Sequence, residues 1–182
     1  SNLAVFNPGT APVSVRIVAA SGSGDGREVV AADALRLEAG EWRQADGILA
    51  AAGIGQGWVV VERLDGGSFG AYGVVNAGAT NDGSFLEAQS DAASGTVLTV
   101  PALVETSAFR TELVLANRGS SPAILTLDYR ESRSPSSGVG GSVAVTLAPR
   151  EQRIVPEAVA FLRGLGVTIG PDAIVAAGAL VT

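Results

Sequence analysis

The chain repeats its own pattern at an offset of 110 residues, and this repeat limits its possible folds more than any local motif does. Because one fixed shift aligns residues suited to turns and to a core, the sequence predicts two tandem copies of one supersecondary unit. The aligned pairs are Leu3 with Leu113, Asn7 with Asn117, Gly9 with Gly119, Pro12 with Pro122, Ala34 with Ala144, Leu37 with Leu147, Glu41 with Glu151 and Arg43 with Arg153.

Each copy opens with two short strands separated by an Asn-x-Gly-x-x-Pro segment. Apolar alternation predicts strands at 3–6 and 12–17 in the first copy, and at 111–115 and 124–129 in the second. An Asn side chain bonds to its own turn, Gly accepts positive φ, and Pro fits the start of a strand. We therefore assign the segment to a hairpin corner with a structural role, and its residues are Asn7, Gly9, Pro12, Asn117, Gly119 and Pro122.

The rest of each copy predicts more short strands and one short helix. The first helix is expected to be capped by Asp46, and the second to begin at Pro156. Further strands are expected at 34–37, 58–62, 68–76, 83–86, 97–104, 142–147 and 176–181. The predicted core positions are Leu3, Val5, Val15, Ile17, Leu35, Leu37, Leu113, Leu115, Leu125, Leu127, Val145 and Leu147.

These elements predict an all-β fold of tandem β-sandwich repeats, each of about seven strands with one short helix. The first repeat spans 1–92 and lacks a leading strand, and the second spans 97–182 and lacks the last strands. Because the two repeats lack different strands, we expect the sequence to be part of a longer array of repeats. Two separate sandwiches and one pseudo-symmetric unit both fit this pattern.

Missing residue types exclude several kinds of chemistry. The chain contains no His, Cys or Met, and its 12 basic residues are all Arg. A Ser-His-Asp triad, an ordinary zinc site and a P-loop lysine are therefore ruled out. The net charge of -6 disfavours nucleic acid, and no apolar run reaches the roughly 20 residues that span a bilayer. We expect no cofactor, no catalytic residue and no membrane span.

The corner segments resemble those of immunoglobulin-like β-sandwich repeats in bacterial secreted and surface proteins, which include Hydin-type repeats and cell-adhesion-related bacterial domains. The resemblance rests on residues 7–12 and 117–122 and covers about two strands per copy. It implies a non-catalytic structural or interaction module, located outside the cell, that contacts a protein or a polysaccharide. No catalytic residues come with this resemblance.

The alternative function is a carbohydrate-binding module attached to a secreted enzyme, because such modules stack sugars on aromatic rings. Trp42 aligns with Gln152 between the matched Glu41 and Arg43, which suggests an exposed position. Trp58 is expected in the core, and the strand phase of Tyr72 is left open. The Gly- and Ser-rich loops 21–27 and 130–141 are the other expected binding regions. The candidate contacts are Trp42, Arg130 and Arg133.

Calcium binding and catalysis are weaker alternatives. The acidic residues Asp25, Asp65, Asp82 and Asp91 lack the spacing that gathers six to eight oxygens around calcium. Carboxylate pairs that could hydrolyse a glycoside would come from Glu62 with Asp65, or from Glu105. Asp and Glu at such positions more often keep a small module soluble, so we assign no metal ligand.

Overall fold

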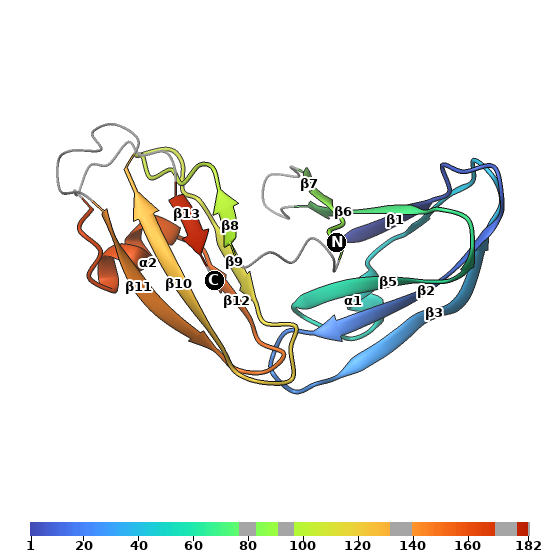
Figure 1. Cartoon of the computed structure of the whole chain (residues 1–182), viewed down its shortest axis with the longest axis horizontal. Helices are drawn as coiled ribbons and strands as arrows, with labels where there is room; N and C mark the ends of the chain where they lie inside the picture. The colour runs from blue at the N-terminus through green and yellow to red at the C-terminus, as the bar shows by residue number, and fades with distance from the viewer. Residues whose placement is uncertain (77–82, 91–96, 132–139, 170–177, 182) are drawn as a thin grey trace. The chain divides into compact units, whose positions relative to one another are not determined.

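The computed structural model describes residues 1–76, 83–90, 97–131, 140–169 and 178–181, without the side chains of the last segment. The chain divides into two compact units, Ser1–Ala93 and Ser94–Thr182. Among the described residues, strands dominate both units, every strand pairing is antiparallel, and each unit has one short helix (Figure 1). The prediction of an all-β chain is confirmed. None of the described helices is long and apolar enough to cross a membrane.

The first unit consists of two facing sheets and the one-turn helix α1 (Ile48–Ala51). One sheet has the order β4-β1-β6-β7 and the other β3-β2-β5. Strands of the first sheet are β1 (Asn2–Phe6), β4 (Trp42–Ala45), β6 (Gly70–Asn76) and β7 (Gly83–Glu87). Strands of the second sheet are β2 (Val13–Ser21), β3 (Glu28–Leu37) and β5 (Gly57–Gly66).

The core of the first unit follows the period of two along β1 and β2. Leu3 and Val5 point inward from β1, where they meet the inward residues of β2 and the end of β3. Ile48 of α1 completes this cluster. The predicted core positions of this unit are buried except Leu35, which is half-buried and packs against the cluster.

The second unit also has two sheets and one helix, and this helix is longer. Its four-stranded sheet has the order β11-β10-β13-β8, and it faces the pair β12-β9. The helix α2 (Ala158–Gly164) buries Ala158, Val159 and Leu162 in the core with Tyr129. The strands are β8 (Val97–Val100), β9 (Leu113–Ala116), β10 (Ala123–Arg130), β11 (Gly140–Leu147), β12 (Gln152–Val155) and β13 (Gly178–Val181).

The corner segment is an arch between sheets, so the expected hairpin is wrong. β1 pairs with β4 and β6, while β2 pairs with β3 and β5. The second unit separates β9 from β10 in the same way. Each of the two strands has one apolar face, and crossing between sheets lets both faces pack against each other in the core. The turn residues are compatible with a hairpin or an arch, and only burial selects between them.

Three further expectations differ from the structure. The residue that precedes α1 is Gly47, not Asp46, and α2 begins at Ala158, two residues after the expected start at Pro156. Trp58 is half-buried instead of central to the core. Its neighbours Val59 and Val61 pack against the core from β5, so alternation turns Trp58 to the opposite face.

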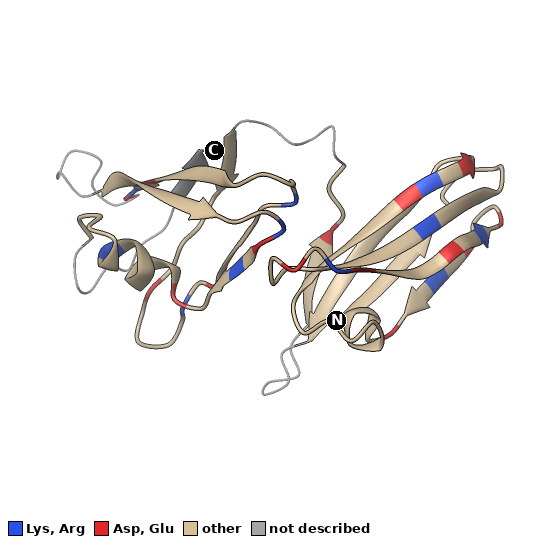
Figure 2. Cartoon of the chain, turned by 90° about the horizontal axis from the view of Figure 1, so that it is seen from below, with Lys and Arg blue, Asp and Glu red and all other residues tan. Residues whose placement is uncertain are grey.

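Charged residues of both signs are interspersed over the three-stranded sheet of the first unit (Figure 2). Arg16 on β2 lies 3.5 Å from Asp33 on β3 and 3.6 Å from Glu62 on β5. These pairs bridge neighbouring strands on the outer face. The opposite sheet of this unit has an outer face of a different kind.

Candidate interaction surface

An aromatic cluster covers the outer face of the sheet β4-β1-β6-β7. Register places Phe6 opposite Trp42, Ala4 opposite Tyr72, and Val74 opposite Phe85. Because directly paired residues point to the same side of a sheet, all these side chains face away from Leu3 and Val5. We call this surface the aromatic face, and it is formed by Phe6, Trp42, Tyr72 and Phe85.

Direct contacts hold the rings of the aromatic face in place. The indole Nε1 of Trp42 donates a hydrogen bond to the hydroxyl of Tyr72 at 3.2 Å. The ring centroids of Tyr72 and Phe85 lie 5.1 Å apart with planes inclined by 35°. Trp42 is 50% exposed and Phe85 is 65% exposed, so both rings keep a large open surface. Alternating positions on paired strands thus produce a fixed set of rings.

Glycine at position 70 makes room for the edge of this cluster. A Cβ atom at Gly70 would lie 2.3 Å from the Cζ atom of Phe6, which stands opposite it on β1. The ring of Phe6 therefore lies over the backbone of β6. Any side chain at this position would displace Phe6 from the aromatic face.

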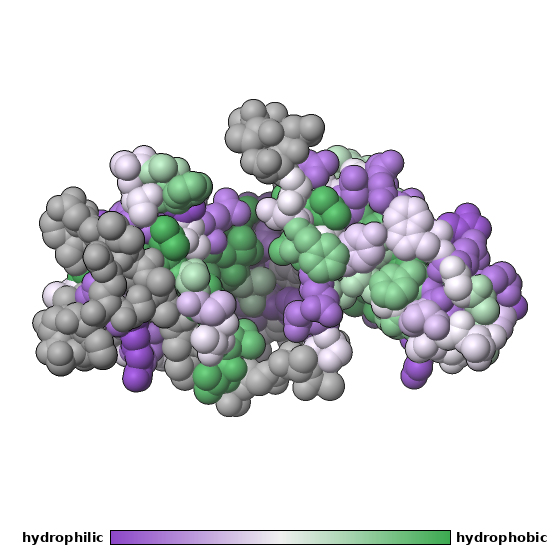
Figure 3. Space-filling model, turned by 90° about the horizontal axis from the view of Figure 1, so that it is seen from above, coloured by the Kyte–Doolittle hydropathy of each residue, from purple (hydrophilic) through white to green (hydrophobic). Residues whose placement is uncertain are grey.

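The polar groups around the rings are mostly neutral. Asn2, Gln44 and Glu87 share the outward phase of β1, β4 and β7, and Glu87 is the one carboxylate among them. The amide of Gln44 donates to Asp46 at 2.5 Å, and the amide oxygen of Asn2 accepts from the backbone of Gly47 at 3.1 Å. Figure 3 shows aromatic rings gathered on the N-terminal unit, with hydrophilic residues beside them. This composition suits a partner with little charge.

The corner residues of the first unit bond to backbone. The amide of Asn7 donates to the carbonyl oxygens of Ala11 at 2.9 Å and Leu37 at 3.2 Å, and its Oδ1 accepts from the N–H of Gly9 at 2.9 Å. Asn7 is 1% exposed, so these bonds satisfy a buried amide. Pro12 immediately precedes β2.

The second unit reproduces the same corner. The amide of Asn117 donates to Ser121 at 2.8 Å and Ala148 at 2.9 Å, and its Oδ1 accepts from Gly119 at 2.9 Å. Pro122 immediately precedes β10. The Asn side chain thus links the arch to the end of β3 in the first unit and to the turn after β11 in the second.

An acid and an arginine close that turn in each unit. Glu41 accepts from the N–H of Glu38 at 2.8 Å and from Arg43 at 2.6 Å, and Glu151 accepts from Ala148 at 2.6 Å and from Arg153 at 2.7 Å. The backbone N–H, followed by the arginine, lowers the pKa of both carboxyl groups. The carboxylates therefore stay ionised and fix the turn.

The structure does not bring together Trp42 and Arg130, two of the residues predicted to contact a ligand, because they belong to different units. Trp42 belongs to the aromatic face of the first unit, whereas Arg130 ends β10 in the second and pairs with Asp128 at 2.8 Å. Arg133 lies outside the described residues. In the loop 21–27, Arg27 donates to the carbonyl oxygens of Ala52 and Gly53, at 2.8 Å and 2.9 Å.

Three of the described acidic candidates, Glu62, Glu105 and Asp25, have structural partners. The carboxylate of Glu105 lies 2.5 Å from Arg163 on α2, and this hydrogen bond lowers its pKa. Asp25 accepts from the backbone N–H of Arg27 at 3.0 Å. Asp82 and Asp91 lie outside the described residues. Within the described ranges, no three His, Cys, Asp or Glu residues gather into a possible metal site.

Comparison of the chain with protein-family models, curated proteins and solved structures found no match. The site therefore has to be argued from its own geometry.

Sequence reasoning missed Phe6 and Phe85 as parts of the surface. The signal was present for Phe6, because a strand that buries Leu3 and Val5 must turn Phe6 outward. Phe85 becomes part of the face only through the pairing of β7 with β6. That pairing brings it beside Tyr72, and this neighbour relation is not encoded in local alternation.

Proposed function

We propose that the chain is a non-catalytic interaction module built from tandem immunoglobulin-like β-sandwich repeats, and that its first unit binds through the aromatic face. The observation that carries this proposal is the contact set of Trp42, Tyr72 and Phe85 on one open sheet face. The duplicated arches at Asn7 and Asn117 support common ancestry of the two units.

The physical case rests on the free energy of covering exposed rings. An aromatic side chain buries 150–250 Å² when it is fully covered, and apolar area contributes about 25 cal/mol per Å². The rings already hold each other on a sheet, so little conformational entropy is lost on binding. Aromatic residues are also enriched among the side chains that dominate interface energies. The aromatic face is therefore the best-supported binding surface of the first unit.

The setting that we propose is a longer secreted or surface-exposed bacterial protein with further repeats. Support comes from the resemblance of residues 7–12 and 117–122 to such repeats and from the all-β architecture. In this setting the second unit would act as a spacer that presents the first.

Photocrosslinking from the aromatic face tests the interaction role. Benzoylphenylalanine placed at Phe85 should give defined adducts with surface proteins or polysaccharides of the source cells, and unlabelled wild-type chain should compete. Ile124 is 69% exposed in the second unit, so the same probe there is a matched control. Equal adducts at both positions, or competition by Trp42→Ala as strong as by wild type, would contradict the proposal.

A carbohydrate-binding module is the second candidate, and the hydrogen bond between Trp42 and Tyr72 favours it. Sugar rings stack their C–H faces on aromatic rings, while their hydroxyls need neutral donors and acceptors such as Gln44. On a glycan array, binding should be lost in Trp42→Ala and kept in Ile124→Ala. Binding that survives Trp42→Ala would remove the sugar function from this face.

A further inference from the structure

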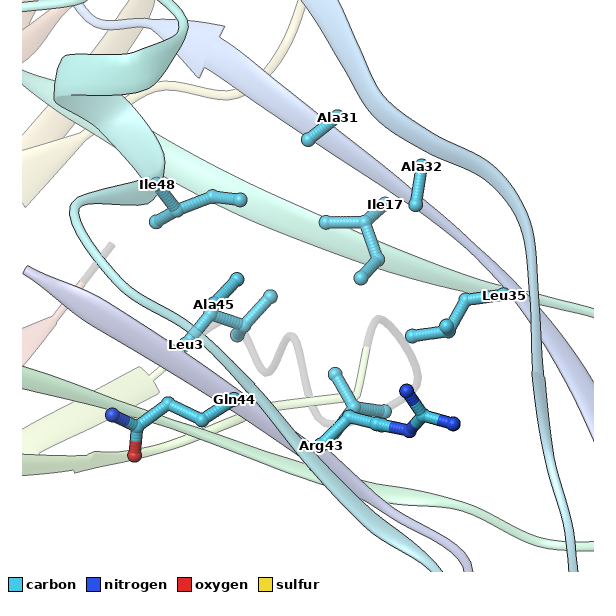
Figure 4. Close-up of a pocket in the computed structure, with 10 residues that line it drawn as sticks. Leu3, Ile17, Ala31, Ala32, Leu35, Arg43, Gln44, Ala45 and Ile48 are labelled. Carbon is cyan, nitrogen blue, oxygen red and sulfur yellow. The ribbon is translucent and has the colours of Figure 1, made fainter.

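The first unit contains a second feature that the aromatic face does not explain, a cavity between its two sheets. Its volume is about 250 Å³, and it opens at the edge where β3 and β4 face each other. Figure 4 shows aliphatic side chains from both sheets and from α1 facing this space. Leu3, Ile17, Leu35 and Ile48 provide much of this apolar lining.

Small residues create the cavity, as the second unit demonstrates at equivalent positions. Ala45 pairs with Leu3 on β1, and its counterpart Val155 pairs with Leu113 on β9. Val155 is 7% exposed and belongs to the core of the second unit. The repeat therefore places alanine in the first unit where the second fills its core with valine.

Ala32 makes the same contrast on the opposite wall. It stands opposite Ile17 on β2, and in the second unit Val143 stands opposite Leu127 on β10. Val143 packs against the core cluster of its unit. Two valines in the second unit are thus replaced by two alanines that line the cavity of the first.

Register shifts add to this difference. The pairing of β2 with β3 shifts twice, between Val15 and Ile17 and between Ile17 and Val18, whereas β10 pairs with β11 in unbroken register. Each shift inserts an extra residue in β3 and bends the strand locally. The shifts occur beside Ala31 and Ala32, at the wall of the cavity.

An arginine bridges the open edge in the second unit but not in the first. Arg153 donates from Nη2 to the carbonyl oxygen of Thr146 on β11 at 3.0 Å, in addition to its bond with Glu151. Its counterpart Arg43 bonds to Glu41 among the described residues and lines the cavity. A guanidinium has five N–H donors, so Arg43 retains donors for a ligand.

We infer that this cavity binds an unbranched aliphatic carboxylate of about eight carbons, with its chain between the sheets and its carboxylate at Arg43. A dry cavity of about 150 Å³ accommodates benzene, so 250 Å³ scales to roughly ten non-hydrogen atoms. Octanoate has that size. The apolar walls suit its chain, and the guanidinium complements its charge. This inference is independent of the aromatic face.

Titration calorimetry of octanoate into the full chain tests this inference. Wild type should bind octanoate, and Ala45→Val, which refills the space as in the second unit, should weaken binding at least tenfold. Ala144→Val, at an exposed position of β11, is the matched control and should bind as wild type does. Ala32→Val is a second filling variant. Tryptophan fluorescence checks that both filling variants keep the first unit folded, and circular dichroism checks the fold of Ala144→Val.

Two comparisons identify the role of Arg43 and the location of the ligand. Arg43→Gln should weaken octanoate binding about tenfold while leaving octan-1-ol binding unchanged. Trp42→Ala should keep octanoate binding, because it alters only the aromatic face. Absence of octanoate binding to wild type, equal binding by Ala45→Val, or loss in Trp42→Ala alone would each overturn the inference.

Discussion

The buried amide of Asn7 gives the sharpest test of how the sequence motif supports the fold. Replacing it with alanine removes one acceptor and a donor group that serves two carbonyl oxygens, those of Ala11 and Leu37. A hydrogen bond contributes about 1 kcal/mol net, and a buried group left without its partner costs a further 1–3 kcal/mol. We expect Asn7→Ala to lower the free energy of unfolding of the first unit by about 2–4 kcal/mol.

Tryptophan fluorescence can follow the first unit within the full chain, because both tryptophans, Trp42 and Trp58, lie in it. In urea unfolding, the midpoint of the fluorescence transition should therefore lie at a lower urea concentration for Asn7→Ala than for wild type. Asn76→Ala, which removes the same group from an exposed position, should change stability by less than about 0.5 kcal/mol.

A charged variant, Asn7→Asp, tests whether the two hydrogen bonds that the Asn7 amide donates stabilise the arch. Asn7→Asp keeps an acceptor for the N–H of Gly9 but turns a carboxylate oxygen toward the two carbonyl oxygens. It should be at least as destabilising as alanine at pH 7. If Asn7→Ala matched the Asn76→Ala control, the buried hydrogen bonds would not stabilise the arch and the reasoning would be refuted.

Four other predictions concern the core, the turn, an ion pair and the pH dependence of stability. Leu115 is 5% exposed, so Leu115→Ala should lower the free energy of unfolding of the second unit by about 2–5 kcal/mol, measured by calorimetry. A loss of less than about 0.5 kcal/mol would contradict its place in the core. Gly40→Ala should cost about 1 kcal/mol in the fluorescence assay, because φ is +73° there. Arg163 lowers the pKa of Glu105, so this carboxylate stabilises the fold above its unfolded pKa and stops doing so as pH falls through the folded one. The stability gap between wild type and Glu105→Gln should thus be present at pH 7 and close in acid; a gap independent of pH would contradict this. Because the chain lacks His, stability should be nearly flat between about pH 6 and 8.

Local pattern predicted much of the fold because the information was periodic. Alternation along 3–6 and 124–129 identified strands and their inward residues. The predicted core positions are buried except Leu35 and Leu125, which are half-buried and pack against the cores. The turn residues also had local causes, since an Asn-x-Gly segment bonds to itself. Residues 132–139 of the predicted loop, including Arg133, lie outside the described residues.

Sheet membership could not be predicted from the same pattern. A strand followed by a turn and another strand satisfies the local rules whether the two strands pair or cross to facing sheets. The structure selects the arch, because β1 and β2 bury their faces against each other. Trp58 shows the same limit, since a continuous apolar run in β5 hides which residues face the core.

By itself, the sequence determined the all-β class and the Asn-based turns, because both depend on residues close together in the chain. Tertiary structure alone decided which rings share the aromatic face and which copy keeps a cavity. Both depend on strand pairing between distant segments, as when Phe85 joins Tyr72 and Ala45 faces the core beside Leu3. Pairing between distant strands determines which side chains become neighbours, and the proposed functions of these side chains depend on those neighbours.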